Sequence, residues 1–136
     1  MSEAAVQTTL RPARLVFVKL IAVDLDAMTG FYQRAFGLEA ARTIEMEGLK
    51  EVILQRPGDP AGASLILYHH TDGRAVSVGT AHGPVGLAVR DVDAAFAQAL
   101  AAGASPVREP FEVPGMRVAF VNDPEGHEIE IVSFKA

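Results

Sequence analysis

The sequence predicts an α+β domain built from two copies of one unit, a strand, a helix and three further strands. The chain repeats itself: a shift of 67 residues places 24–27 (Asp-Leu-Asp-Ala) on 91–94 (Asp-Val-Asp-Ala), and a shift of 64 places Leu65 on Ile129. A length of 136 residues suits one domain. Each unit alone buries one face, so the copies must pack together. We therefore expect a paired α+β domain with pseudo-twofold symmetry.

The first copy begins with an expected strand over residues 15–23. Apolar residues from Met28 to Phe36 then recur at i, i+3, i+4, i+7 and i+8, which indicates an amphipathic helix with an aromatic core stripe. Asp24 or Asp26 caps the start of this helix, and Gly37 ends it. Three strands are expected next, over 38–45, 49–55 and 63–70, with turns between them.

The second copy follows a glycine-rich linker over residues 71–83. We expect a strand over 85–90 and a helix that Asp91 or Asp93 caps and Gly103 ends. Three strands complete the copy, over 105–109, 116–121 and 127–134, and residues 110–115 and 122–126 connect them. The predicted organisation is a disordered tail over 1–14 and one domain over 15–136, with modules at about 15–70 and 84–134.

Composition excludes several classes of function. The chain has no cysteine, so disulfides, thiolate metal sites and cysteine nucleophiles are excluded. A net charge of −5 argues against nucleic-acid or anionic-membrane partners. The apolar runs are too short to span a bilayer, and residues 1–14 lack the features of a secretory signal. The expected location is the cytoplasm.

Three stretches carry a family resemblance: VKLIAVDLDAMTGFYQRAFGL (18–38), VGLAVRDVDAAFAQALAAGA (85–104) and VAFVNDPEGHEIEIV (118–132). Together they resemble the vicinal oxygen chelate superfamily, which includes glyoxalase I, the bleomycin-resistance proteins and the extradiol dioxygenases. The turn Asp-Pro-Glu-Gly at 123–126, followed by an alternating strand, is the most specific piece. The resemblance implies paired βαβββ modules whose curved mixed sheets enclose a cavity, but many activities share this fold.

The resemblance also implies four metal-ligand positions in metal-dependent members, on the first and last strands of each module. In this sequence they fall on Phe17, Ile66, Pro84 and Glu130, so Glu130 is the one donor retained. A divalent metal needs three or four N or O donors, at about 2.0–2.2 Å. A displaced set of His70, His82 and Glu130 is the alternative for Zn, Ni, Fe or Mn. Each shift of two residues, however, moves a donor about 6.6 Å along its strand.

Side chains two residues apart on a strand point to the same face, so residues near the four metal-ligand positions are further candidates to line a ligand pocket. Lys19 shares a face with Phe17, either reaching solvent or pairing with Glu130 or an anionic substrate group. Glu130 is the candidate acid/base residue, because a carboxylate on an apolar strand is rarely buried unless paired or functional. His127 is expected at the surface. The full set of expected substrate-binding residues is Phe17, Lys19, Ile66, Tyr68, His70, Arg117 and Glu128.

Two functions remain open from the sequence. The first is a glyoxalase-like lyase or isomerase that acts on a small oxygenated substrate with a degenerate metal site. The alternative is a metal-free module of the bleomycin-resistance type that binds a drug or an aromatic molecule, for which the net charge of −5 favours a cationic ligand. The arrangement common in the family implies a homodimer, and a monomer whose own modules close one cavity is the alternative.

Overall fold

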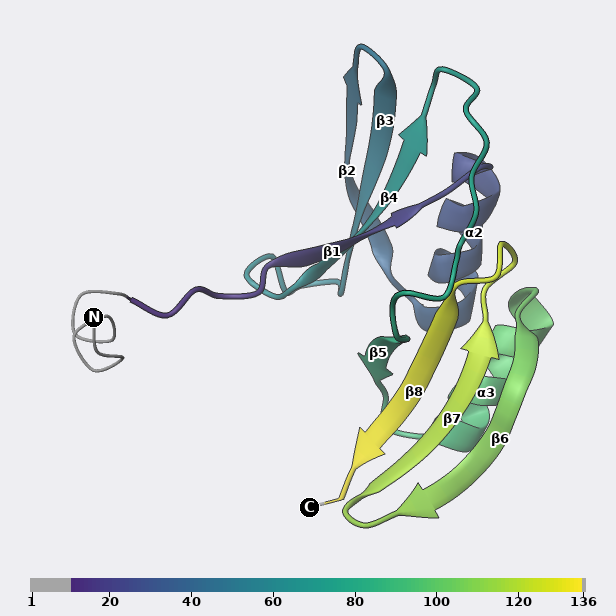
Figure 1. Ribbon diagram of the computed structural model, residues 1–136. Coiled ribbons are helices and arrows are strands. Elements are labelled where there is room, and N and C mark those ends of the chain that lie inside the picture. Colours follow the sequence, from purple (N-terminus) through teal and green to yellow (C-terminus); the bar gives the residue numbers. More distant parts are fainter. Residues whose placement is uncertain (1–10, 136) are drawn as a thin grey trace, which may run out of the picture.

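The computed structural model describes residues 11–135 and shows two modules, each a four-stranded sheet with a helix on one face (Figure 1). The first module contains β1 (Phe17–Ile21), α2 (Leu25–Phe36), β2 (Glu39–Met46), β3 (Leu49–Gln55) and β4 (Ser64–His70). The second contains β5 (Val85–Ala88), α3 (Val92–Ala102), β6 (Ser105–Val113), β7 (Met116–Asn122) and β8 (Glu128–Phe134). The predicted α+β fold of paired βαβββ modules is confirmed. Residues 1–10 of the predicted disordered tail lie outside the described residues.

The two sheets have the same strand order, β1-β4-β3-β2 and β5-β8-β7-β6. In each, the first strand is parallel to the last, and the other neighbours are antiparallel. Within residues 11–135, β1 and β5 are edge strands, so the sheets stay separate and do not close around a cavity in one chain. The expectation that the sheets enclose a cavity is therefore corrected for the single chain. The edge strands β1 and β5 each pair with one strand of their own sheet and not with each other, so the two sheets do not join into one wall.

Both helices start and end with the same side-chain chemistry. The Asp24 carboxylate accepts a hydrogen bond from the Ala27 amide at 3.0 Å, and the Asp91 carboxylate accepts one from the Ala94 amide at 3.1 Å. Gly37 follows α2 with a positive φ of 67°, which suits glycine because it has no Cβ. Within the described chain, neither helix nor any other is long and apolar enough to cross a membrane.

Strand β6 is longer than the sequence predicts. It runs from Ser105 to Val113, through Pro110, where the sequence indicated a connection. The register with β7 shifts between Pro106 and Arg108 and again between Arg108 and Phe111. These irregularities accommodate prolines, which donate no backbone hydrogen bond, and β6 is an edge strand where such a loss is tolerated.

The core lies between each sheet and its helix. Leu65 and Leu67 of β4 and Ile129 and Ile131 of β8 face it and are buried. The predicted aromatic stripe of α2 belongs to the same core, with Phe31 and Tyr32 at 0% exposure and Phe36 partly buried. The opposite face of each sheet carries no helix, and we call it the open face of that module.

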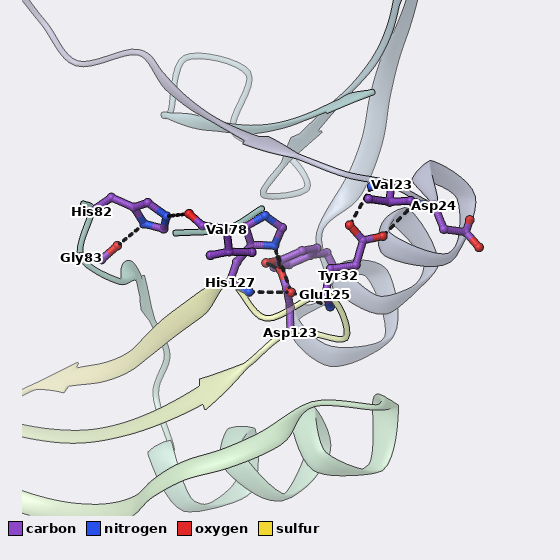
Figure 2. A network of polar contacts seen from close by, with 9 residues as sticks. All are labelled: Val23, Asp24, Tyr32, Val78, His82, Gly83, Asp123, Glu125 and His127. Atoms are coloured by element: carbon purple, nitrogen blue, oxygen red, sulfur yellow. Dashed lines mark hydrogen bonds and ion pairs between the residues drawn. The ribbon is translucent and has the colours of Figure 1, made fainter. Parts of the chain in front are cut away.

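The modules are joined by a buried polar network at the β7–β8 turn (Figure 2). The Tyr32 hydroxyl of α2 donates to Asp123 Oδ2 at 2.7 Å, and His127 Nδ1 lies 2.8 Å from the same oxygen. The Asp123 side chain is fully buried and that of His127 is 5% exposed. The expectation that His127 lies at the surface is therefore wrong. The residue after the turn faces the first module rather than solvent, because the modules pack over it.

The same turn makes a second contact with the first module. The Glu125 carboxylate accepts hydrogen bonds from the backbone amides of Val23 at 2.7 Å and Asp24 at 2.8 Å, at the start of α2 (Figure 2). An anionic group at a helix N-terminus is stabilised by the orphan amides and the helix dipole. We call Tyr32, Asp123, Glu125 and His127 together the inter-module latch.

The latch has no symmetric counterpart in the chain. Residues 59–62 repeat the turn as Asp-Pro-Ala-Gly, and the Gly62 amide donates to the Asp59 carbonyl as Gly126 does to Asp123. Alanine, however, stands at the repeat positions of the other latch residues: Ala61 for Glu125, Ala63 for His127 and Ala99 for Tyr32. The module junction is therefore latched on one side only.

We expect Tyr32→Phe to lower the free energy of unfolding by about 1–3 kcal/mol, because it leaves a buried carboxylate with one donor fewer. Burial raises the pKa of the Tyr32 hydroxyl well above its usual range, so this group remains a donor. Urea denaturation measures the change. Tyr68→Phe is the matched control and should shift stability by less than about 0.5 kcal/mol. Equal losses in the two variants would contradict the latch.

The His127–Asp123 pair predicts a pH-dependent stability. The hydrogen bond to Asp123 is the main cause that raises the pKa of His127 above 6.5, and the nearby Glu125 raises it further. Because the folded-state pKa is raised, the pair contributes fully below the ordinary pKa and is lost as pH rises through the raised value. Stability, measured by urea denaturation, should therefore fall as the pH rises above about 6.5. His127→Gln should flatten this decline and His82→Gln should not.

Candidate functional site

The open face of the first module presents side chains that alternate with the core residues. Strand register places Lys19 beside Ile66 and Ile53, and Phe17 beside Ser64. Phe17, Lys19, Ile66, Tyr68 and His70, all predicted from sequence, lie on this one face. The Tyr68 and His70 rings meet edge to face, with centroids 4.9 Å apart.

Lys19 is held by three neighbours on this face. Its Nζ lies 2.7 Å from Glu51 Oε2, 5.4 Å from the centroid of the Phe17 ring and 5.2 Å from that of Tyr68. An ammonium over aromatic faces is attracted by the ring quadrupoles. Within this chain, then, Lys19 pairs with Glu51 and not with Glu130, and the ion pair fixes its charge over the open face.

Sequence reasoning missed Glu51. The side chain is 10% exposed and lies on the open face of β3, next to Val52, which faces the core. Alternation along β3 places a charged residue between the apolar Leu49 and Ile53 on one face, and that was the available signal. Only strand register, however, brings this carboxylate to Lys19.

A cavity of about 440 Å³ opens on this face. Three of the predicted residues, Phe17, Lys19 and Ile66, line it, together with Glu51. Its walls combine apolar side chains with a few polar groups, a composition that suits a small organic ligand. Tyr68 and His70 share the face without lining the cavity.

The open face of the second module carries the predicted acidic pair. Glu130 lies on β8 between Gly86 of β5 and Phe120 of β7, and it is half-buried. Glu128, also half-buried, lies one step along the same face. Among the described residues no ion pair reaches Glu130. Its carboxylate is therefore uncommitted within the chain.

Aromatic side chains flank this acidic pair. The Phe111 and Phe120 rings stack with centroids 6.4 Å apart, and the Arg108 guanidinium lies 3.7 Å from the centroid of Phe111. Arg117 does not join the group. It precedes Phe120 by an odd number of residues, so it points to the helix face, where Nε donates to Asp93 Oδ2 of α3 at 2.7 Å. The expectation that Arg117 reaches the pocket is corrected by this register.

The residues present do not fit a metal. Three of the four ligand positions carry Phe17, Ile66 and Pro84, which have no donor side chain. The displaced set is not assembled either, because residues 11–135 contain no cluster of three His, Asp or Glu side chains able to hold a metal. His82 instead lies in the linker with its ring nitrogens at the carbonyls of Val78 and Gly83, 3.1 and 3.2 Å away (Figure 2).

A larger cleft, of about 860 Å³, lies between the modules on the core side of β1 and β5. Its walls are mainly apolar and include Leu20, Leu65 and Leu87. Asp59 and Ala63, from the turn that lacks latch residues, also line it. Glu128 and Glu130 line neither cavity of the single chain.

The structure defines an α+β protein of two βαβββ modules with an uncovered sheet face on each. Comparison with known proteins identifies its family. The model of the Glyoxalase/Bleomycin resistance protein/Dioxygenase superfamily matches residues 14–131. The chain belongs to this superfamily, as the sequence resemblance indicated.

The curated relatives include lactoylglutathione lyases. The chain is 31% identical to a probable lactoylglutathione lyase of Vibrio parahaemolyticus, over 90% of this chain and 91% of the relative. It is also 31% identical to the lactoylglutathione lyase of Haemophilus influenzae, over 83% and 87%. Glyoxalase I from Zea mays has a similar fold, with a TM-score of 0.79 and 24% identity over 88% of this chain. The chain spans 44% of the maize protein. These relatives are glyoxalase I-like.

Proposed function

We propose that this chain is a glyoxalase-related enzyme of the lyase or isomerase type that acts on a small oxygenated molecule without the four-ligand metal centre. The observation that carries the proposal is Glu130. It is the one donor kept at the family's ligand positions, it lies half-buried on an open face, and no described residue neutralises it. A carboxylate so placed is available for general acid/base catalysis. The expected location, the cytoplasm, remains a prediction.

In the proposed chemistry Glu130 moves a proton. Its carboxylate accepts a proton from the hydroxyl-bearing carbon next to a substrate carbonyl, and the electron pair of the broken C–H bond moves onto the carbonyl oxygen to give an enediolate. Glu130 then returns the proton to the former carbonyl carbon, and the hydroxyl proton passes to the former carbonyl oxygen, so that the carbonyl and hydroxyl groups exchange places. Such a step needs a positive group or hydrogen-bond donors near that oxygen. Two such charges lie on the open faces: the Arg108 guanidinium, on the same face as Glu130, and the Lys19 ammonium, on the other module. We assign Lys19, which its ion pair with Glu51 holds in place, and this assignment requires the two open faces to be brought together.

A second copy of the chain supplies this arrangement. The first open face carries Lys19 and the second carries Glu128 and Glu130, so the first face of one copy complements the second face of the other. Large apolar side chains are also exposed on these faces, with Phe17 at 45%, Met46 at 65% and Phe134 at 69%. Exposed apolar groups on facing surfaces favour association.

We expect a homodimer, with a mass about twice 14.4 kDa by multi-angle light scattering at micromolar concentration. Phe134→Asp should shift the population toward monomer, because it places a charge on an apolar surface that the partner covers. A wild-type mass of 14.4 kDa at that concentration would contradict the shared site.

Hydrogen exchange tests the proton-transfer role of Glu130. In D₂O the wild-type chain should exchange the carbon-bound hydrogens of a hydroxycarbonyl probe such as hydroxyacetone or lactaldehyde faster than buffer, followed by NMR. Glu130→Gln should slow this exchange by a factor of about 10² or more, the usual scale for loss of an acid/base group. Chelator treatment should leave the wild-type rate unchanged. Glu47→Gln removes one carboxylate from an exposed turn and is the control.

Binding without catalysis is the second candidate function. The stacked Phe111 and Phe120 rings and the apolar cavity wall formed by Phe17 and Ile66 favour an aromatic ligand. If the chain only binds its ligand, the hydroxycarbonyl probe should bind, but its carbon-bound hydrogens should exchange no faster than in buffer. The exchange experiment therefore separates the two functions.

A further inference from the structure

The cavity on the first open face is rich in hydrogen-bond donors. Arg14 and Lys19 line it, and among residues 11–135 Glu51 is the one acidic residue in its lining. Gln55 Nε2 donates to Ser64 Oγ at 3.1 Å, so the hydroxyl hydrogen of Ser64 remains available to another acceptor. The local charge is therefore positive, although the whole chain carries −5.

Glu51 holds the lysine in place. Its side chain is nine-tenths buried, and among the described residues its Oε2 has no polar partner besides the Lys19 ammonium. A carboxylate buried in this way depends on its counter-ion, because removing the charge from water is costly. The Phe17 and Tyr68 rings flank the same ammonium. Lys19 is thus positioned by three groups, while its side chain stays 38% exposed and lines the cavity.

We propose that this cavity binds the carboxylate of a small organic anion, with Lys19 as the binding group. Ser64 and Arg14 supply further donors, and Ile53, Ile66 and Phe17 contact the apolar body of the ligand. An ammonium has three N–H donors, so the pair with Glu51 leaves donors for a ligand. This inference rests on the proposed function, because it assigns an acidic group to the substrate of that site.

The position of the lysine relative to the lost ligand positions supports the assignment. Lys19 is the register partner of Ile66 and lies two residues after Phe17 on the same face. Both neighbours occupy positions where metal-dependent members of the family are expected to hold a cation. In this chain the positive charge at that place is an ammonium, and it suits an anionic oxygen of the ligand.

Binding of matched probes to the full chain tests the proposal. Calorimetry and ¹H–¹⁵N NMR compare benzoate with benzamide, which is neutral, and with benzylammonium, which is cationic. Benzoate should bind about tenfold more tightly than benzamide, the effect of one charge-assisted hydrogen bond. Backbone shifts should cluster at Lys19, Ser64 and Ile66. Tighter binding of benzylammonium than of benzoate would overturn the proposal.

Two variants isolate the lysine. Glu51→Gln keeps shape and frees the ammonium from its counter-ion, so benzoate affinity should rise severalfold. Adding Lys19→Met to that variant removes the cation without leaving a buried charge unpaired, and benzoate affinity should then fall about tenfold or more below that of Glu51→Gln. Thermal melting confirms that both remain folded. Equal affinities in the two variants would refute the role of Lys19.

Lys50→Met is the matched control. Lys50 forms an ion pair with Glu45 on the other face of the same sheet, with Nζ 3.4 Å from Oε1, and its loss should leave benzoate affinity unchanged. A fall equal to that of the Lys19 change would also refute the proposal.

Failure of the anion-site proposal can be distinguished from failure of the proposed function. Hydrogen exchange dependent on Glu130 with no benzoate binding refutes the anion site alone, and benzoate binding to a monomer without exchange refutes the proposed function alone.

Discussion

The buried carboxylate of Asp123 is the interaction on which the arrangement of the modules depends. It accepts from a hydroxyl on α2 and pairs with His127 on its own side, so both modules meet at one fully desolvated acid. Hydrogen bonds to a buried charge are stronger than those at the surface, and a missing partner is costly. Glu125 of the same turn also binds the backbone at the start of α2, so this short turn joins the second module to the first through two sets of polar contacts, beside the packing of α2 against α3.

This latch leaves both open faces free. All four of its residues lie at the junction or on the core side, and none of them belongs to the strand faces that carry Lys19 or Glu130. The repeat of the turn at 59–62 has lost the side chains that would make a second latch, and the larger cleft lies beside it. The two units thus meet through this one-sided latch, through the packing of α2 against α3, where Gln98 Nε2 donates to the Arg34 carbonyl at 3.0 Å, and through a shared apolar core. The latch therefore contributes no side chain to the open faces, where three of the four ligand positions carry residues without donor groups.

The two open faces differ in charge, and this difference organises the proposed chemistry. The first presents a lysine fixed by a buried glutamate, and the second presents two half-buried glutamates beside stacked phenylalanines. In the proposed dimer the lysine would stabilise negative charge on the substrate oxygen and the glutamate would act as the base. The family fold alone does not decide between catalysis and binding, because that choice depends on these few side chains.

Local patterns in the sequence predict the repeat, the two helices with their aspartate caps, the aromatic core stripe and the shared faces of Phe17 with Lys19 and of Glu128 with Glu130. These features follow from local periodicity, which each segment carries in its own residues. Tertiary structure alone decided that Lys19 pairs with Glu51, that Arg117 turns to α3, that His127 is buried and that β6 continues through Pro110. Each of these depends on strand register or on module packing. Contacts between residues far apart in the chain set both, and no local pattern records them.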